Sequence, residues 1–201
     1  MLFCIVDTET TGLKPDYHEI IQVAAIMCDS GLRELGRTAF KIRPQRIERA
    51  SKRALEINGY HPRTWNPDFY TIHAAMENLN LFVAQFNKFE EEIIPAGQNV
   101  GFDVNFMLEA YNSSGVLYPF SYQYLDLIEI VKIWERARKE RLKNRTLAYL
   151  SEYTGCLNTN PHDAEADAVV TLDILKWFIS DLKKGTDYAN KSLGKYTPSE
   201  V

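Results

Sequence analysis

Two acidic residues near the start of the chain, Asp7 and Glu9, follow directly after an apolar run over residues 2–6. Such a run predicts a strand covered on both faces, and residues two apart on a strand point to the same side. No Lys or Arg lies between Leu2 and Leu13 to neutralise the pair. Two unit charges about 4 Å apart repel by about 4 kcal/mol at an effective dielectric constant near 20. A hard divalent cation such as Mg²⁺ or Mn²⁺ would remove that repulsion, although both carboxylates could instead cap a turn or point into water.

Two later segments carry further reactive groups. The segment 99–103 (NVGFD) joins an expected strand to a helix start, where Asp103 could simply be an N-cap. The segment 162–167 (HDAEAD) follows a Pro that favours helix entry. Inside a regular helix His162 and Asp167 would be about 140° apart, so they can act together only if His162 lies on the entry turn. A histidine at such a place is otherwise a local hydrogen-bonding group.

Apolar runs bounded by turn residues predict the strands that must position these groups. Short connections between the first three runs favour an antiparallel meander. The expected strands cover residues 2–6, 20–28, 38–42, 94–99 and 122–125.

Apolar residues that recur every three or four positions predict helices after the first three strands. Asn66-Pro67 signals one helix start, and Asp126 with Glu129 forms a capping-box pattern at another. The expected helices cover residues 68–94, 103–115, a basic stretch opening at Asp126, a short stretch ending at Gly155, and a last stretch reaching about Leu182. Strands first and helices interleaved later indicate an α/β fold with helices packed on the sheet.

Composition places the chain among folded globular proteins. It has 201 residues, of which 45% are hydrophobic and 25% charged, enough for one domain with a substantial core. We expect that domain to span residues 1–184 and a loose polar tail to span 185–201. No apolar run approaches the roughly 18 residues needed to cross a membrane, and the start lacks the features of a signal peptide, so a cytoplasmic protein is expected. Three widely spaced cysteines are expected to be small hydrophobes rather than metal or redox groups; they are Cys4, Cys28 and Cys156.

The net charge of −4 is unevenly distributed. Segment 41–53 has six basic residues and one Glu, and segment 132–145 has seven basic residues and two Glu, so each carries +5 and the rest of the chain −14. A basic rim around an acidic site suits an enzyme that holds phosphates while it binds divalent metals. Either segment alone could equally be a solvated surface element.

The three acidic segments, in this order, resemble the motifs of the DEDDh group of the DnaQ-like 3′–5′ exonucleases. The first resembles DxE followed by TTGL, the second N-x-x-F-D, and the third H-x-A-x-x-D. The resemblance runs from about residue 2 to residue 182, and the opening IVDTETTGL is most similar to proofreading subunits of bacterial replicative polymerases. Those subunits often have His before the glycine of a middle turn, where this chain has Asn58.

The resemblance implies a single-domain RNase H-like fold, a mixed sheet of about five strands flanked by helices. It implies metal-dependent hydrolysis of DNA or RNA from the 3′ end, with release of nucleoside monophosphates and two Mg²⁺ or Mn²⁺ ions as cofactors. Asp7, Glu9, Asp103 and Asp167 would be the metal ligands and His162 the general base. The implied substrate-binding residues are Thr8, Thr10, Leu13, Asn58, Asn99 and Phe102.

Other interpretations remain open at this point. A chain with the same fold could be a catalytically silent nucleic-acid-binding or polymerase-accessory module. The His162-Asp163 pair could belong to an HD-type phosphohydrolase, which is all-helical. Within the exonuclease interpretation, the expected partner is a nucleic acid with a single-stranded or frayed 3′ end, and a DNA polymerase is a second candidate partner. The sequence leaves open DNA against RNA, a free-standing nuclease against a polymerase subunit, and the oligomeric state.

Overall fold

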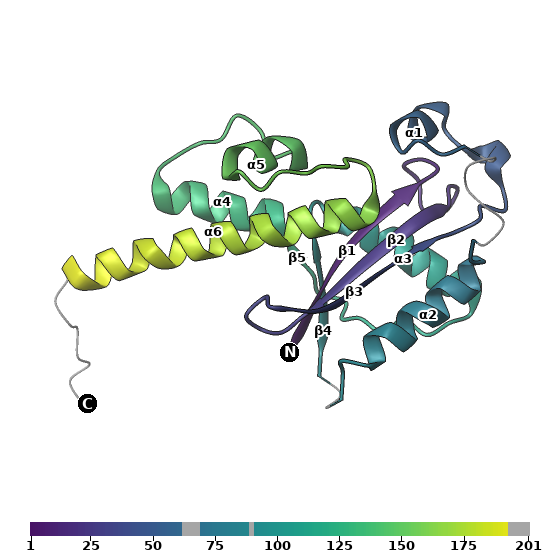
Figure 1. Ribbon diagram of the computed structural model, residues 1–201, viewed down its shortest axis with the longest axis horizontal. Coiled ribbons are helices and arrows are strands. Elements are labelled where there is room, and N and C mark those ends of the chain that lie inside the picture. Colours follow the sequence, from purple (N-terminus) through teal and green to yellow (C-terminus); the bar gives the residue numbers. More distant parts are fainter. Residues whose placement is uncertain (62–68, 89–90, 193–201) are drawn as a thin grey trace.

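A computed structural model describes residues 1–61, 69–88 and 91–192, with side chains up to residue 184 (Figure 1). The helix-start signal at Asn66-Pro67 and the end of the expected tail, residues 193–201, lie outside these ranges. Among the described residues, no helix combines the length and the apolar character that a membrane crossing requires.

The sheet has five strands in the order β3-β2-β1-β4-β5. β1 pairs antiparallel with β2, which pairs antiparallel with β3, while β1 pairs parallel with β4 and β4 parallel with β5. The predicted mixed sheet and its antiparallel meander are therefore confirmed. The strands are β1 (Leu2–Thr10), β2 (Ile20–Cys28), β3 (Glu34–Lys41), β4 (Ile93–Gly97) and β5 (Leu125–Asp126).

Helices cover both faces of this sheet (Figure 1). One apolar cluster joins one face to α2 (Ile72–Ala84) and α3 (Gly101–Ser114). A second joins the other face to α4 (Leu127–Arg138), α5 (Leu147–Thr154) and α6 (Ala164–Ser192). An all-helical HD-type fold is therefore excluded.

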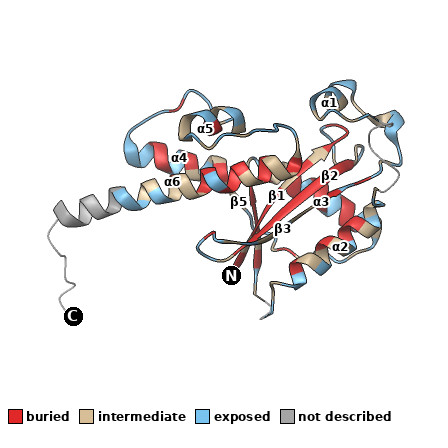
Figure 2. Ribbon diagram, in the orientation of Figure 1, coloured by how far each residue is buried: buried red, intermediate tan, exposed pale blue. Residues whose placement is uncertain are grey.

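The apolar runs of the sequence form the central strands β1 and β2, which are covered on both faces. Every residue of β2 is buried, and the strands are the most continuously buried part of the chain (Figure 2). Alternate residues of β1 enter different clusters, with Cys4 and Val6 facing α3 and Ile5 facing α6. Of the three cysteines expected to be small buried hydrophobes, Cys4 and Cys28 are fully buried, whereas Cys156 is only partly buried and packs at the margin of the second apolar cluster.

The helix observed in this region is shorter than the one expected over residues 68–94 from the apolar pattern. α2 ends at Ala84, and the Asn87 side chain then closes a turn by bonding the backbone of Glu91 through both its amide nitrogen and oxygen. The chain reverses there, and Ile93 pairs with Leu2 in the parallel ladder. β4 begins with Ile93 and Ile94, and these apolar residues happen to fall at positions that fit the helical spacing of α2. Spacing alone therefore cannot show where the helix ends and the strand begins.

Other boundaries also differ from the sequence expectations. α6 continues to Ser192, beyond the expected boundary at 184, because one glycine costs a helix only about 1 kcal/mol and no proline follows at once. The expected capping box at α4 is half formed, since Asp126 caps Ile128 N while Glu129 pairs with Lys132. β5 is reduced to Leu125–Asp126, and the short helix α1 (Lys52–Ile57) and a 3₁₀ turn before it were not predicted.

Gly97 marks the closest approach of β4 to β1. A Cβ at this position would lie 2.8 Å from the backbone oxygen of Val6 and 3.0 Å from Val100 Cγ2. We expect Gly97→Ala to lower the free energy of unfolding by about 1–3 kcal/mol, because an extra methyl group in a packed interior forces the backbone apart. Urea unfolding followed by circular dichroism measures this.

Gly31→Ala is the matched control. Its Cβ would lie 3.4 Å from Asp29 Oδ1 in an exposed turn, so a change within about 0.5 kcal/mol is expected. Equal losses in the two variants would contradict the assigned approach of the strands.

Candidate active site

Asp7 and Glu9 project from the part of β1 that extends beyond β4. The β1–β4 ladder ends at Ile5↔Ala96, whereas β2 continues to pair with β1 opposite both acids. Their side chains therefore emerge at the carboxyl end of β1, next to the parallel neighbour that has already ended. Ligand sites in open α/β sheets commonly lie outside the carboxyl ends of strands at such a point.

Asp103 reaches β1 from the first turn of α3. It is 4% exposed, and its Oδ1 accepts hydrogen bonds from Thr8 N at 2.8 Å and Thr8 Oγ1 at 2.7 Å. The N-cap of α3 is Val100, which makes no side-chain cap bond. The bonds to Thr8 join the carboxylate to the strand that carries Asp7 and Glu9, so Asp103 belongs to this acidic group rather than serving only as a cap.

His162 and Asp167 lie at the entry of α6, in the arrangement that their spacing required. His162 has a left-handed backbone (φ 66°) just before the helix begins at Ala164. Asp163 caps the helix by accepting a bond from Ala166 N at 3.2 Å. Potential ligand atoms of Glu9, His162 and Asp167 all lie within 4.8 Å of one another.

Burial and mutual repulsion alter the acidity of all four carboxyls. Burial, and then the charges of Asp103, Asp167 and Glu9, raise the pKa of Asp7 well above its usual value. Burial, followed by Asp167 and Asp103, raises the pKa of Glu9 to about 8. Burial raises the pKa of Asp103 to about 7 against the opposing bonds from Thr8, and burial also raises the pKa of Asp167. The four groups therefore form an acidic cluster that strongly favours uptake of positive charge.

Two polar side chains that the sequence analysis did not single out hold this entry in place. Asn158 Nδ2 donates to Asp167 Oδ1 at 2.5 Å, and Gln22 Nε2 donates to Asp163 Oδ2 at 3.1 Å. Gln22 is the lone polar residue of β2, which was a readable signal. Asn158 lies in an irregular connection where no pattern distinguishes it.

A pocket of about 240 Å³ adjoins Glu9. It lies between the end of β1 and α1, and Asn58 Nδ2 holds the two together by donating to Thr10 O at 3.0 Å. Five of the six residues that the resemblance assigned to substrate meet there. The lining consists of Thr8, Glu9, Thr10, Gly12, Leu13, Ser51, Arg53, Ala54, Ile57, Asn58 and Phe102.

Asn99, the sixth residue, does not line this pocket. It has a left-handed backbone (φ 54°), and its backbone N–H donates to Asp126 Oδ1 at 3.1 Å. Its place is in the turn between β4 and α3, where it ties that turn to the end of β5.

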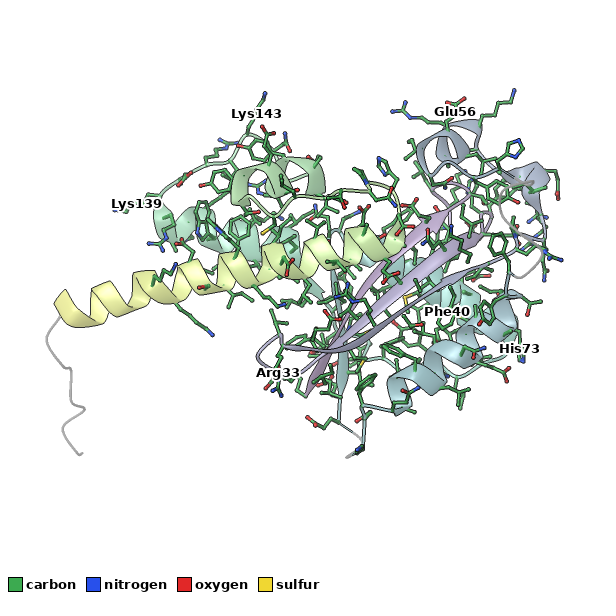
Figure 3. All side chains as sticks on the ribbon, viewed as in Figure 1. Arg33, Phe40, Glu56, His73, Lys139 and Lys143 are labelled. Atoms are coloured by element: carbon green, nitrogen blue, oxygen red, sulfur yellow. The ribbon has the colours of Figure 1, made fainter. Side chains whose placement is uncertain are left out.

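The two basic segments lie in different places, so the expectation of one basic rim is only partly met. Segment 41–53 ends in the first turn of α1 and supplies Ser51 and Arg53 to the pocket. Segment 132–145 supplies no pocket residue. Lys139 and Lys143 lie at the end of α4 and above α5, on the other side of the molecule from Glu56 of α1 (Figure 3).

The family model RNase_T, described as "Exonuclease", matches residues 4–175. A PolC-type DNA polymerase III from Ureaplasma parvum is 24% identical over 174 residues, which are 87% of this chain and 11% of that protein. The 3′-5′ exonuclease DinG from Staphylococcus aureus is 26% identical over 180 residues, which are 86% of this chain and 18% of that protein. The chain therefore spans less than a fifth of these curated relatives.

Solved structures of exonuclease I have the same fold. One superposes with a TM-score of 0.78 at 23% identity, covering 93% of this chain and 42% of that chain. The Escherichia coli enzyme in complex with a dT13 oligonucleotide gives 0.77 at 22% identity, with coverages of 93% and 43%. The expected RNase H-like fold is confirmed.

The raised carboxyl pKa values predict a pH dependence of stability. Because these folded carboxyls keep protons that the unfolded chain releases, the stability that they contribute is fully present below the unfolded values near pH 4 and is lost as pH rises through about pH 7–8. In EDTA the melting temperature should fall over this range, and Mg²⁺ or Mn²⁺ should restore it most at the alkaline end. Differential scanning calorimetry measures both effects.

Asp7→Asn is the informative variant, because it removes one charge from the cluster. In EDTA at about pH 8 it should melt above the unaltered protein, and the stabilisation by metal should weaken. A melting temperature that rises with pH in EDTA would contradict the assigned repulsion.

Proposed function

The chain belongs to the RNase_T family of exonucleases, and on that premise we propose that it is a metal-dependent 3′–5′ exonuclease that releases nucleoside monophosphates from DNA. The observation that carries the proposal is that Glu9, His162 and Asp167 offer ligand atoms within 4.8 Å of one another, while the charges of Asp103 and Asp167 help to raise the pKa values of both Asp7 and Glu9. A pocket with apolar walls adjoins Glu9 and suits the terminal nucleotide of a strand.

The names of related proteins support the polarity and the substrate. A relative from Staphylococcus aureus is a 3′-5′ exonuclease, and exonuclease I has been solved with a dT13 strand. The PolC relationship makes a DNA polymerase a candidate partner for this chain. We assign DNA as the substrate on these relationships, with RNA as the alternative to be measured beside it.

The residues present fit a pair of divalent ions. Carboxylate oxygens are hard ligands suited to Mg²⁺ or Mn²⁺, and four carboxylates can balance two such ions in charge. Asp7, Glu9, Asp103 and Asp167 would hold the ions. When bound, two divalent ions activate a water, stabilise the crowded phosphorus and neutralise the leaving oxygen.

The protein side chains supply the remaining chemistry. His162 lies on a tight entry turn, so its imidazole is held beside Glu9 and Asp167 rather than along the helix. An imidazole is well suited to accept a proton from an attacking water at neutral pH. Asn158 and Thr8 hold the carboxylates of Asp167 and Asp103 in place through the bonds given above.

The pocket residues orient the terminal nucleotide. Leu13 lines the pocket and is 81% exposed, so its side chain is available for apolar contact with a base. Phe102 faces the same pocket, and an aromatic ring is a stacking surface that tolerates any base. Thr8 and Thr10 offer polar groups between these apolar walls.

A catalytically silent binding module is the alternative. The complete set of carboxylates and the histidine beside them favour the enzyme, because a binding module has no need to accumulate charges that repel one another. Incubation of the protein with 5′-labelled and 3′-labelled strands in Mg²⁺, Mn²⁺ or EDTA distinguishes an enzyme from a binding module. Metal-dependent shortening from the 3′ end is expected, and intact strands that remain bound to metal-saturated protein would establish the module.

His162→Ala tests the assigned base. We expect turnover to fall by about two to four orders of magnitude, because general-base catalysis contributes about that much. Folding and metal binding should be nearly unchanged, and calorimetry measures both. His73→Ala is the control, since His73 lies on α2 and pairs with Glu77. Equal turnover in the two variants would remove His162 from the mechanism.

Phe102→Ala tests the pocket. We expect KM for single-stranded DNA to rise by about 5- to 100-fold, because stacking on an aromatic side chain contributes about 1–3 kcal/mol per base. Phe102→Tyr keeps the ring and should leave KM close to its original value. A similar loss in both variants would indicate that Phe102 serves only its packing against Phe106, at 4.8 Å between ring centroids.

A further inference from the structure

The connection between α4 and α5 buries one side chain and exposes those on either side of it. Leu142 is 6% exposed and packs into the core beneath α5 and α6. Lys139, Arg141 and Lys143 are all exposed, and we name these three residues the basic stripe. Figure 3 shows Lys139 and Lys143 pointing outward from this connection.

The backbone beneath the basic stripe is fixed by buried polar contacts. Glu135 is 8% exposed, and it accepts bonds from Leu142 N at 2.8 Å and from Arg145 Nη2 at 2.5 Å. Glu140 accepts a bond from the Tyr153 hydroxyl at 2.7 Å. The connection is therefore held in shape before any ligand arrives, which lowers the entropy cost of binding.

The basic stripe carries positive charge that the protein does not pair. Within the residues that the structure describes, none of its three members forms an ion pair. Two nearby acids are engaged elsewhere, with Glu135 bound by Arg145 and Asp181 by Arg138. Glu140, which is exposed between Lys139 and Arg141, accepts a bond from the Tyr153 hydroxyl and leaves the stripe with an excess of positive charge. In a chain of net charge −4, three such cations on one connection point to an external anion.

The connection is bonded to the segment between β4 and α3, which precedes Asp103. Gln98 Nε2 donates to the backbone oxygen of Arg145 at 2.6 Å. Gln98 follows β4 and precedes the turn that starts α3, the helix that positions Asp103. The basic stripe therefore ends only two residues before Arg145, whose backbone is bonded to the residue that follows β4.

The active site itself creates the need for such a surface. Its carboxylates repel phosphates, and the pocket has room for little more than one terminal nucleotide. Affinity of proteins for nucleic acid strands comes largely from cations that neutralise backbone phosphates. Those cations must lie outside the cavity, along the path of the strand.

We propose that the basic stripe binds the phosphates of the single strand upstream of the 3′ end, so that longer strands are held better than short ones. The proposal rests on the exonuclease function proposed above and extends it to a second contact. Its ligand is a single-stranded polyanion, recognised by charge rather than by sequence.

The test replaces all three side chains with glutamine in Lys139→Gln, Arg141→Gln and Lys143→Gln. For an oligothymidylate of about 20 nucleotides at about 150 mM salt, KM should rise by about 10-fold, whereas KM for a strand of about four nucleotides should change by less than about two-fold. The turnover number should be unchanged for both lengths, since none of these residues touches the reacting atoms.

Salt dependence gives a readout that does not require hydrolysis. Binding of the longer strand is measured by fluorescence anisotropy in the His162→Ala background with Mg²⁺ present. Loss of three phosphate contacts should reduce the slope of log Kd against log salt by about 2, because each contact to a single strand contributes about 0.7. Melting temperatures of all variants are compared to confirm that they fold.

A control variant removes the same charge elsewhere, through Arg33→Gln, Lys88→Gln and Lys176→Gln. Arg33 lies at the β2–β3 turn, away from Lys139 and Lys143 (Figure 3). The control should keep the original KM and salt slope if position matters rather than net charge. Equal effects of the two triple variants, or an unchanged KM for the long strand in the basic-stripe variant, would overturn the proposal.

The outcomes separate this inference from the function on which it rests. Hydrolysis of the short strand by the unaltered protein supports the function, whatever the basic stripe does. If the protein hydrolyses neither strand but the anisotropy slope still falls, the function is wrong and the binding surface stands. If the slope and KM are both unchanged while the short strand is hydrolysed, the function stands and the surface is wrong.

Discussion

Repulsion among four carboxylates is the interaction on which the rest of this structure depends. Asp7 and Glu9 come from the central strand, Asp103 from the start of α3 and Asp167 from the start of α6. Burial raises the cost of their charges and so raises their pKa values. Only a rigid fold can hold such groups together in the absence of a cation, because nothing local favours their meeting.

The sheet topology supplies that rigidity. β1 is buried between an antiparallel neighbour, β2, and a parallel one, β4. β4 ends before β1 does, so the acids emerge where one side of the strand is open. Two apolar layers, one against α2 and α3 and one against α4, α5 and α6, then fix the helices that carry Asp103 and Asp167.

An acidic site that must receive an acidic substrate requires a separation of charge across the molecule. Apolar walls and neutral hydroxyls line most of the pocket, with a single cation from α1. The second basic segment is placed beyond the cavity, where it neither quenches the carboxylates nor competes with metal for them. The net charge of −4 is therefore the sum of an acidic cluster at the end of β1 and basic segments elsewhere in the chain.

The sequence by itself determined the local features. The apolar runs predicted β2 at its full length, the two-residue spacing placed Asp7 and Glu9 on one side of β1, and the spacing of His162 and Asp167 required the entry turn that is observed. Each follows from a backbone period or a steric rule that acts over a few residues. Gly115 and Gly155 likewise ended α3 and α5 as expected, with left-handed backbones.

Only the tertiary structure decided the contacts between distant residues. The bond from Thr8 to Asp103 spans 95 positions and the one from Gln22 to Asp163 spans 141. Such pairings depend on how layers pack, as do the end of α2 at Ala84, the absence of Asn99 from the pocket and the outward position of the basic stripe. A residue's type and its neighbours in sequence state what it can bond, whereas the packed fold determines which partner comes within reach.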